Sequence, residues 1–97
     1  MSTPEGKIKT ETKALLAKYK PQLYAHWPVQ NGMGEPTLDC IGAFRGHAFA
    51  IETKAPGKKP TLRQEQTILK MRAAEIPVFV IDGDLTTLRL WLNTRAN

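Results

Sequence analysis

Cysteine is almost absent from the sequence, since Cys40 is the one cysteine among 97 residues. Such a chain cannot form an internal disulfide or a cysteine-rich zinc site, so two common ways of stabilising a small domain are excluded. Long apolar runs are also missing: the longest, such as Ile76 to Ile81, have the length of one strand, whereas a membrane span needs about 20 residues. The polar N-terminus lacks the apolar stretch of a signal peptide. These absences predict a cytoplasmic protein held together by packing or by a partner subunit.

What the sequence does contain is typical of one folded domain with a basic surface. Hydrophobic residues make up 41% of the chain and charged residues 24%, which is ordinary for a globular protein, and 97 residues allow one modest core. We therefore expect a single domain over residues 1–97. The net charge of +5 favours an anionic partner, of which nucleic-acid phosphates are the commonest. Charge alone does not decide this, because basic surfaces also keep proteins soluble.

Hydrophobic periodicity and turn residues predict the secondary structure. A helix is expected first, then three strands, a second helix and a fourth strand, with these bounds: Pro4 to Tyr19, Leu23 to Trp27, Leu38 to Phe44, His47 to Lys54, Thr61 to about Glu75, and Val78 to Ile81. Thr86 to Leu92 suits either a last edge strand or a short helix, and Asn93 to Asn97 are expected to fray. The order α-β-β-β-α-β predicts an α/β fold in which helices flank a mixed β-sheet.

Side chains at helical spacing indicate which face of each helix packs against the core. On the first helix they are Ile8, Thr12, Leu15, Leu16 and Tyr19, and on the second they are Leu62, Leu69, Ala73 and Ile76. The two strands around Arg45-Gly46 are expected to form a β-hairpin with that dipeptide as its turn. Cys40 should point into the core as a small buried side chain.

The third predicted strand provides the first functional signal. Because the side chains of a strand alternate between its two faces, Glu52 and Lys54 point the same way, while Phe49, Ile51 and Thr53 point the other way. An acid and a base are thereby placed together. An isolated pair of this kind is usually no more than an ion pair on an exposed sheet. The tripeptide therefore does not establish a functional site by itself.

Asp39, on the preceding strand of the same hairpin, brings a second carboxylate to this place. Two carboxylates can hold a hard divalent cation such as Mg²⁺ through oxygen, and the cation can bind a phosphate oxygen and acidify a water molecule. The ammonium of Lys54 can orient that water or stabilise the negative charge of the transition state. In a basic protein, Asp39, Glu52 and Lys54 together indicate hydrolysis of a phosphodiester bond.

The segment D-C-I-G-A-F-R-G-H-A-F-A-I-E-T-K, with the following Pro/Gly/Lys loop and T-L-R-Q, resembles the VRR-NUC branch of the PD-(D/E)xK nuclease superfamily. The resemblance extends from Glu5 to about Ile81. It implies a restriction-endonuclease-like fold, dependence on Mg²⁺ or Mn²⁺, and hydrolysis of phosphodiester bonds. It also implies similarity to small phage-encoded nucleases, located in the host cytoplasm, that act as homodimers on DNA, including branched DNA such as four-way (Holliday) junctions.

The resemblance also implies roles for individual residues. They are the metal-binding acids Asp39 and Glu52, the backbone carbonyl of Thr53 at the metal, the motif lysine Lys54, and the helix-borne Gln64. Two positions depart from the family pattern. Pro36 stands three positions before Asp39, where the family often has proline directly before the aspartate, so the loop is a variant. Glu75 stands where a glycine usually ends the second helix, which affects the shape of the following turn.

Two of the site assignments have alternatives. Thr61 and Gln64 have the spacing of a capping box, in which the glutamine only satisfies a backbone N–H; the spacing alone favours the cap, whereas the resemblance favours a role in catalysis. The family also has a glutamate on its first helix. Glu5 falls roughly 35° from the centre of the apolar stripe and Glu11 roughly 85° away, so Glu5 is the preferred catalytic and metal-binding acid. A first-turn acid that interacts with the helix dipole is its other interpretation.

Basic and amide side chains near these residues are candidates for contact with nucleic acid. They are Lys58, Lys59 and Arg63 after Lys54, Arg45 in the hairpin turn, and Gln30 and Asn31 in the loop before Asp39. The lysines of the first helix are interpreted as a solvated face. The alternative function is a DNA-binding or junction-binding accessory without catalysis, and a protein that grips a partner protein is a further one. The presence of Asp39, Glu52 and Lys54 together favours the enzyme.

Overall fold

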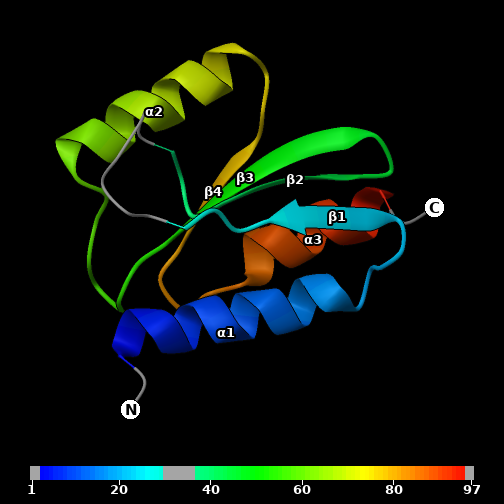
Figure 1. Cartoon of the computed structure of the whole chain (residues 1–97), viewed down its shortest axis with the longest axis horizontal. Coiled ribbons are helices and arrows are strands. Elements are labelled where there is room, and N and C mark those ends of the chain that lie inside the picture. Colours follow the sequence, from blue (N-terminus) through cyan, green and yellow to red (C-terminus); the bar gives the residue numbers. More distant parts are fainter. Residues whose placement is uncertain (1–2, 30–36, 96–97) are drawn as a thin grey trace.

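The computed structural model describes residues 3–29 and 37–95 and confirms the predicted order of elements. Its helices and strands are α1 Pro4–Ala17, β1 Leu23–His26, β2 Cys40–Phe44, β3 His47–Thr53, α2 Leu62–Ala73, β4 Val78–Ile81 and α3 Thr86–Arg95 (Figure 1). The last element, left open between strand and helix, is a helix. The fold is α/β, with a four-stranded mixed sheet flanked by helices.

The sheet has the order β1-β2-β3-β4, in which the first three strands are antiparallel and β4 runs parallel to β3. The predicted β2–β3 hairpin is confirmed, and Arg45 and Gly46 both have positive φ values, 50° and 83°, as a two-residue type I′ turn requires. In the hairpin register Cys40 pairs with Ile51. The start of β2 and the end of β3 therefore lie side by side, at the end of the hairpin away from its turn.

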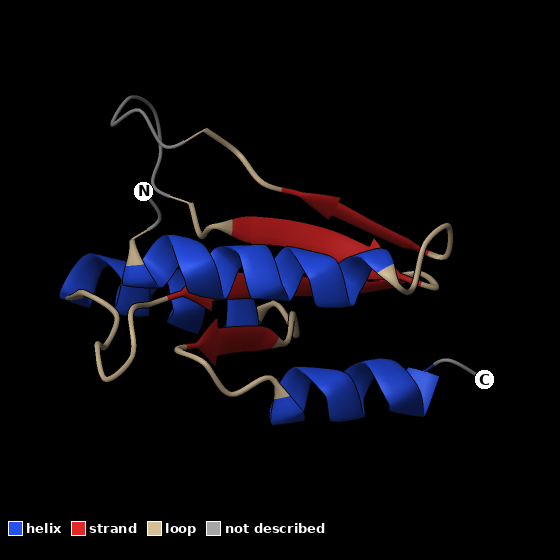
Figure 2. Ribbon diagram, turned by 90° about the horizontal axis from the view of Figure 1, so that it is seen from below, coloured by secondary structure: helices blue, strands red, loops and turns tan. Residues whose placement is uncertain are grey.

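Helices cover both faces of the sheet. Figures 1 and 2 show α1 and α3 side by side on one face and α2 on the other. The larger core cluster joins α1 and α3 to the sheet and includes Phe44, Phe49 and Leu92, whereas a smaller cluster under α2 contains Leu38, Ala50, Ile68 and Val78. β3 is consequently buried on both faces. Within the described residues no helix is long and apolar enough to cross a membrane.

The predicted buried face of α1 is confirmed at four positions: Ile8, Thr12, Leu15 and Leu16. The face predicted for α2 is wrong. Leu62 and Leu69 are 72% and 66% exposed, and Ile68 is the buried residue of the helix. At about 100° per residue, Ile68 lies about 120° from the stripe of Leu62 and Leu69. On this second face Ile68 packs in one buried cluster with Ala50 and Val78 of the sheet.

The helix α3 begins after Asp84, whose Oδ1 accepts a hydrogen bond from the backbone N–H of Thr86. Leu88 and Leu92 bury its inner face. The prediction that the chain frays from Asn93 is wrong for residues 93–95, which are helical. Asn93 accepts a hydrogen bond of 2.8 Å from the Tyr19 hydroxyl, which ties this last turn to the end of α1.

Candidate active site

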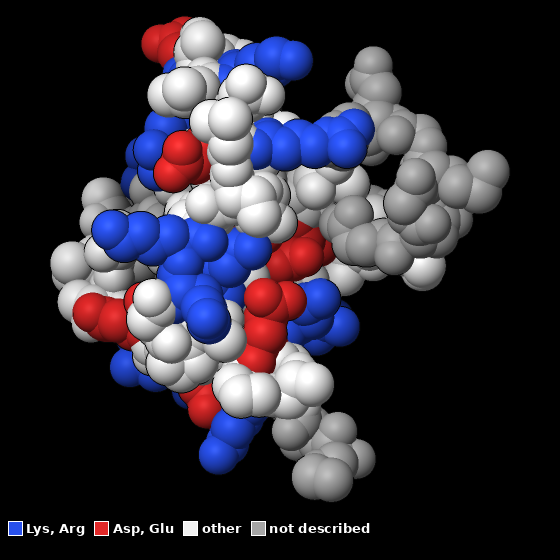
Figure 3. Space-filling model, turned by 90° about the vertical axis from the view of Figure 1, so that its left-hand side faces the viewer, with Lys and Arg blue, Asp and Glu red and all other residues white. Residues whose placement is uncertain are grey.

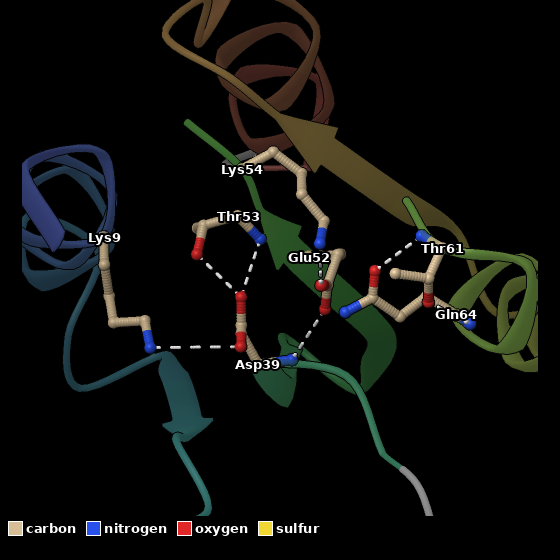
Figure 4. A network of polar contacts seen from close by, with 7 residues as sticks. All are labelled: Lys9, Asp39, Glu52, Thr53, Lys54, Thr61 and Gln64. Carbon is tan, nitrogen blue, oxygen red and sulfur yellow. Dashed lines mark hydrogen bonds and ion pairs between the residues drawn. The ribbon is translucent and has the colours of Figure 1, made fainter. Parts of the chain in front are cut away.

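The predicted acids meet at the end of the β2–β3 hairpin. Asp39 immediately precedes β2, and Glu52 and Thr53 end β3, so the pairing of Cys40 with Ile51 brings Asp39 beside both. Lys54 follows directly. Figure 4 shows that the side chains of Asp39, Glu52 and Lys54 converge on one place, with α1 on one side of it and the start of α2 on the other.

Asp39 is held by residues from two elements. Its Oδ2 accepts two hydrogen bonds from Thr53, at 2.8 Å from the backbone N–H and at 2.7 Å from the hydroxyl. Its Oδ1 lies 3.9 Å from the Nζ of Lys9, which reaches the site from α1. These contacts fix the plane of the carboxylate, so that one oxygen is occupied by Thr53 while the other faces Lys9.

Glu52 is the most buried acid of the site. Its side chain is 3% exposed, its Oε1 accepts a hydrogen bond of 3.3 Å from the Asp39 backbone N–H, and its Oε2 lies 3.5 Å from the Nζ of Lys54. The Lys54 side chain is only 12% exposed. The ion pair is therefore not the exposed surface pair that an isolated acid and base usually form, because both partners are largely removed from water.

Burial and the nearby Asp39 carboxylate raise the pKa of Glu52 to about 7, while the Lys54 ammonium acts in the opposite direction. Burial disfavours the charged form, and a second carboxylate at short range disfavours it further. Lys54 alone does not offset these two effects. The two acids are close enough for the charge of Asp39 to disfavour ionisation of Glu52, and a bound cation would relieve this repulsion.

The donor set at this place fits a hard divalent cation. Mg²⁺ prefers oxygen ligands and is usually held by one or two carboxylates, with water and phosphate completing its coordination. Asp39 and Glu52 supply the carboxylates, and the backbone carbonyl of Thr53 is an additional oxygen nearby. Over residues 3–29 and 37–95 no group of three acidic, histidine or cysteine side chains is placed to hold one metal ion. Glu5 therefore does not form one metal-binding group with Asp39 and Glu52.

Glu5 and Glu11 differ in exposure in the direction that the sequence predicts. Glu5 is half-buried and lies one helical turn before Lys9, whereas Glu11 is exposed. Glu5 is therefore on the side of α1 that faces the site, although the structure shows no contact between it and the two carboxylates.

Gln64 forms the capping box that its spacing predicts. The Thr61 backbone N–H donates to Gln64 Oε1 at 2.9 Å, and the Gln64 backbone N–H donates to Thr61 Oγ1 at 3.2 Å. The same side chain points toward Glu52 (Figure 4). Because the cap uses only the amide oxygen, the NH₂ group of Gln64 is the part that a role in catalysis would use.

The basic residues that follow Lys54 along the chain are exposed to solvent. Lys58 and Lys59 are exposed in the loop after Lys54, and Arg63 is exposed in the first turn of α2. Figure 3, which faces the N-terminal ends of α1 and α2, shows acidic side chains flanked by Lys and Arg side chains. Arg45 is not part of this group: it stands at the hairpin turn, about 20 Å away along β2. Gln30 and Asn31 lie outside the described residues.

Comparison of the chain with models of protein families, with curated proteins and with solved structures finds no match. We therefore infer the function from the fold and from the geometry of the site.

Sequence reasoning missed two features of the site, the ammonium of Lys9 and the hydroxyl of Thr53. The spacing of Lys9 four residues after Glu5 was the available signal, because it places both on one side of α1. Nothing in the sequence indicated that Thr53 would donate to Asp39. Cys40 is buried as predicted, and burial raises the pKa of its thiol to about 12, which excludes it as a nucleophile at neutral pH.

Proposed function

We propose that the protein is a metal-dependent nuclease that hydrolyses phosphodiester bonds of DNA at Asp39, Glu52 and Lys54. The observation that supports this most is the contact of Lys54 with a buried glutamate that also accepts a hydrogen bond from the backbone N–H of a second acid, Asp39. A structural ion pair does not need the second acid, which adds to the effect of burial in raising the pKa of Glu52 and makes the arrangement less stable without a cation. Groups arranged at such a cost to stability are typical of functional sites.

Each residue has a role that follows from its contacts. Asp39 and Glu52, with the carbonyl of Thr53, would hold Mg²⁺ or Mn²⁺, which when bound supplies positive charge to a phosphate oxygen and makes a water molecule more acidic. Lys54 presents its ammonium at the same place, where it orients the attacking water or stabilises the charge that develops on phosphorus oxygens. Thr53 orients Asp39 through its two hydrogen bonds. We expect a product with a 5′ phosphate.

The surroundings of the site support nucleic acid as the substrate. Lys58, Lys59 and Arg63 follow Lys54 along the chain and are exposed, so they can contact phosphates on either side of the bond that is cut. The motif resemblance adds further proposals: that branched DNA such as a four-way junction is preferred, that the protein acts as a homodimer, that Glu5 assists the metal, and that it works in the cytoplasm. The NH₂ group of Gln64 would act beside Glu52.

A DNA-binding protein without catalysis is the second candidate, and one observation favours it. Within the described residues the acids near Lys54 form a pair and not a group of three, and both carboxylates already have lysine partners. Such a network of ion pairs can have a structural role alone. The two candidates make the same prediction for DNA binding and opposite predictions for cleavage.

The decisive test is cleavage of a labelled panel of duplex, single-stranded, flap and four-way-junction DNA in Mg²⁺, Mn²⁺ or EDTA. We expect cutting that requires a divalent cation, leaves 5′ phosphates and disappears in Glu52→Gln, which removes the charge and keeps the shape of the side chain. Binding without cutting in every cation would establish the second candidate instead. Neither binding nor cutting at low salt would reject both.

A further inference from the structure

The structure divides the lysines of α1 between two opposite faces of the helix. Lys9 and Lys13 are four residues apart and therefore lie on one face, about one turn from each other. Lys18, the C-cap of α1 with a helical backbone conformation, follows Lys9 by nine residues, so at about 100° per residue it lies about 180° away. Lys18 and Lys7 are exposed on that opposite face. The helix therefore offers two sets of cations in different surroundings.

The lysines on the face nearer the site are held by contacts. Lys9 Nζ lies 3.9 Å from Asp39 Oδ1, and Lys13 Nζ lies 5.0 Å from the centre of the Trp27 ring, within the range of a cation–π interaction. Trp27 itself is partly buried against the core. The two ammonium groups consequently have restricted positions, and side chains that are already ordered lose less entropy when they bind a ligand.

A shallow cavity continues this surface beyond Lys13. It has a volume of about 210 Å³ and lies between α1 and β1, and its lining includes Lys13, Lys20 and Trp27. Apolar side chains of α1 and β1 complete the lining. Starting from Asp39, the surface thus presents Lys9, then Lys13 beside an aromatic ring, then Lys20.

From this arrangement we propose that Lys9, Lys13 and Lys20 form a phosphate-binding surface for the nucleic-acid strand, on the side of the carboxylates opposite Lys58, Lys59 and Arg63. The inference rests on the proposed function, since both surfaces would contact one substrate. Figure 4 shows Lys9 on one side of Asp39 and Glu52 and the start of α2 on the other. A strand that crosses the site between α1 and the basic loop meets ammonium groups before and after the carboxylates.

The position of these lysines beside the carboxylates distinguishes this surface from basic residues that are spread over a protein and only keep it soluble. Phosphates would repel Asp39 and Glu52 unless cations stood close to both, and Lys9 is the cation nearest to Asp39 that α1 provides. Lys13 extends the same row of charge by one turn, and Trp27 acts as the residue that positions it.

The test compares Lys13→Glu with Lys18→Glu, which change the net charge equally at positions about 140° apart around α1 and its C-cap. Affinity for labelled DNA is measured in EDTA, where no cation supports cleavage, and over a range of salt concentrations. Lys13→Glu should weaken binding by about tenfold, because hydrogen bonds to charged groups are among the stronger ones, and should flatten the salt dependence by about one phosphate contact. Lys18→Glu should change affinity by less than about twofold at 0.15 M salt.

Three further variants guard against a fold defect in Lys13→Glu. Lys20→Glu, in the lining of the cavity, should weaken binding in the same direction, and Trp27→Phe should retain affinity while Trp27→Leu loses it, with melting temperatures recorded for all. Equal losses in Lys13→Glu and Lys18→Glu, with metal-dependent cleavage intact, would overturn the α1 surface and leave the nuclease proposal standing. Absence of DNA binding by the unaltered protein at low salt would instead remove the proposed function and this inference together.

Discussion

Thr53 donates two hydrogen bonds to a single oxygen of Asp39, from its backbone N–H at 2.8 Å and from its hydroxyl at 2.7 Å. Thr53 is fully buried and ends β3, so its position is set by the sheet and not by solvent. The carboxylate of Asp39, which lies outside any strand, thereby takes its orientation from the central strand of the sheet. This is how a residue in a connecting segment is aligned with Glu52.

The hydroxyl of Thr53 should therefore affect metal affinity. Thr53→Val keeps the size and the backbone hydrogen bond but removes one of the two donors to Asp39. Because changes to groups that orient metal ligands typically cost 10–100-fold in affinity, we expect the dissociation constant for Mn²⁺ or Mg²⁺ to rise by about tenfold or more, measured by calorimetry. Thr53→Ser retains the hydroxyl and should bind nearly as the unaltered protein does. Equal affinity in all three proteins would show that the Thr53 hydroxyl does not position the acid.

The raised pKa of Glu52 predicts how the stability of the metal-free protein depends on pH. Its pKa is about 7 in the folded state against 4.5 for the free group, so between these values the folded protein retains a proton that the unfolded chain has lost. Stability then falls as pH rises through this window, by up to about 3 kcal/mol for this one group. Below pH 4.5 the penalty is absent, and above pH 7 it is complete.

Urea unfolding in EDTA at several pH values measures this effect. Glu52→Gln has no charge to bury, so the difference in free energy of unfolding between this variant and the unaltered protein should grow in favour of the variant from pH 4.5 to 7. Added Mn²⁺ should reduce that difference, because it stabilises the ionised carboxylate. A difference that is constant with pH would contradict the electrostatic account of Glu52.

Gln64 can be tested for its two roles separately. Gln64→Glu keeps the oxygen that accepts from Thr61, because glutamate also completes a capping box, but it lacks the NH₂ group that points toward Glu52. We expect a melting temperature close to that of the unaltered protein together with reduced cleavage. Gln64→Ala removes both the capping oxygen and the NH₂ group. Cleavage should therefore be reduced, and the loss of the cap should lower stability by about 1 kcal/mol. Full cleavage by Gln64→Glu would show that Gln64 acts only as a helix cap.

Glu75 provides a prediction about the fold. Its φ of 64° lies in the left-handed region that glycine adopts without strain, at the turn between α2 and Pro77. Glu75→Gly should therefore stabilise the protein by about 1 kcal/mol. Glu65→Gly, which introduces glycine within α2, should destabilise it by about the same amount. Chemical denaturation of both variants checks the contrast, and a loss of stability in Glu75→Gly would mean that the glutamate side chain has a role of its own.

The sequence predicted those parts of the molecule that follow from local spacing. Alternation along β3 placed Glu52 beside Lys54, and the turn at Arg45-Gly46 placed Asp39 near both. The buried face of α2 was not predictable in this way, because two apolar stripes compete on it and only packing against Ala50 and Val78 of the sheet identifies Ile68 as the buried residue. Lys9 and the hydroxyl of Thr53 reach Asp39 through contacts between elements, which no local pattern specifies.

We propose that Lys54 is a catalytic group and not one half of a structural ion pair. Single-turnover cleavage of DNA in Mn²⁺, with enzyme in excess, tests it most directly in the unaltered protein, in Lys54→Ala and in the surface control Lys18→Ala. We expect Lys54→Ala to fold and to bind DNA but to lose at least about 100-fold in the rate of cleavage, as removal of a group that stabilises the transition state does, while Lys18→Ala cuts normally. Cleavage by Lys54→Ala at the rate of the unaltered protein would contradict it.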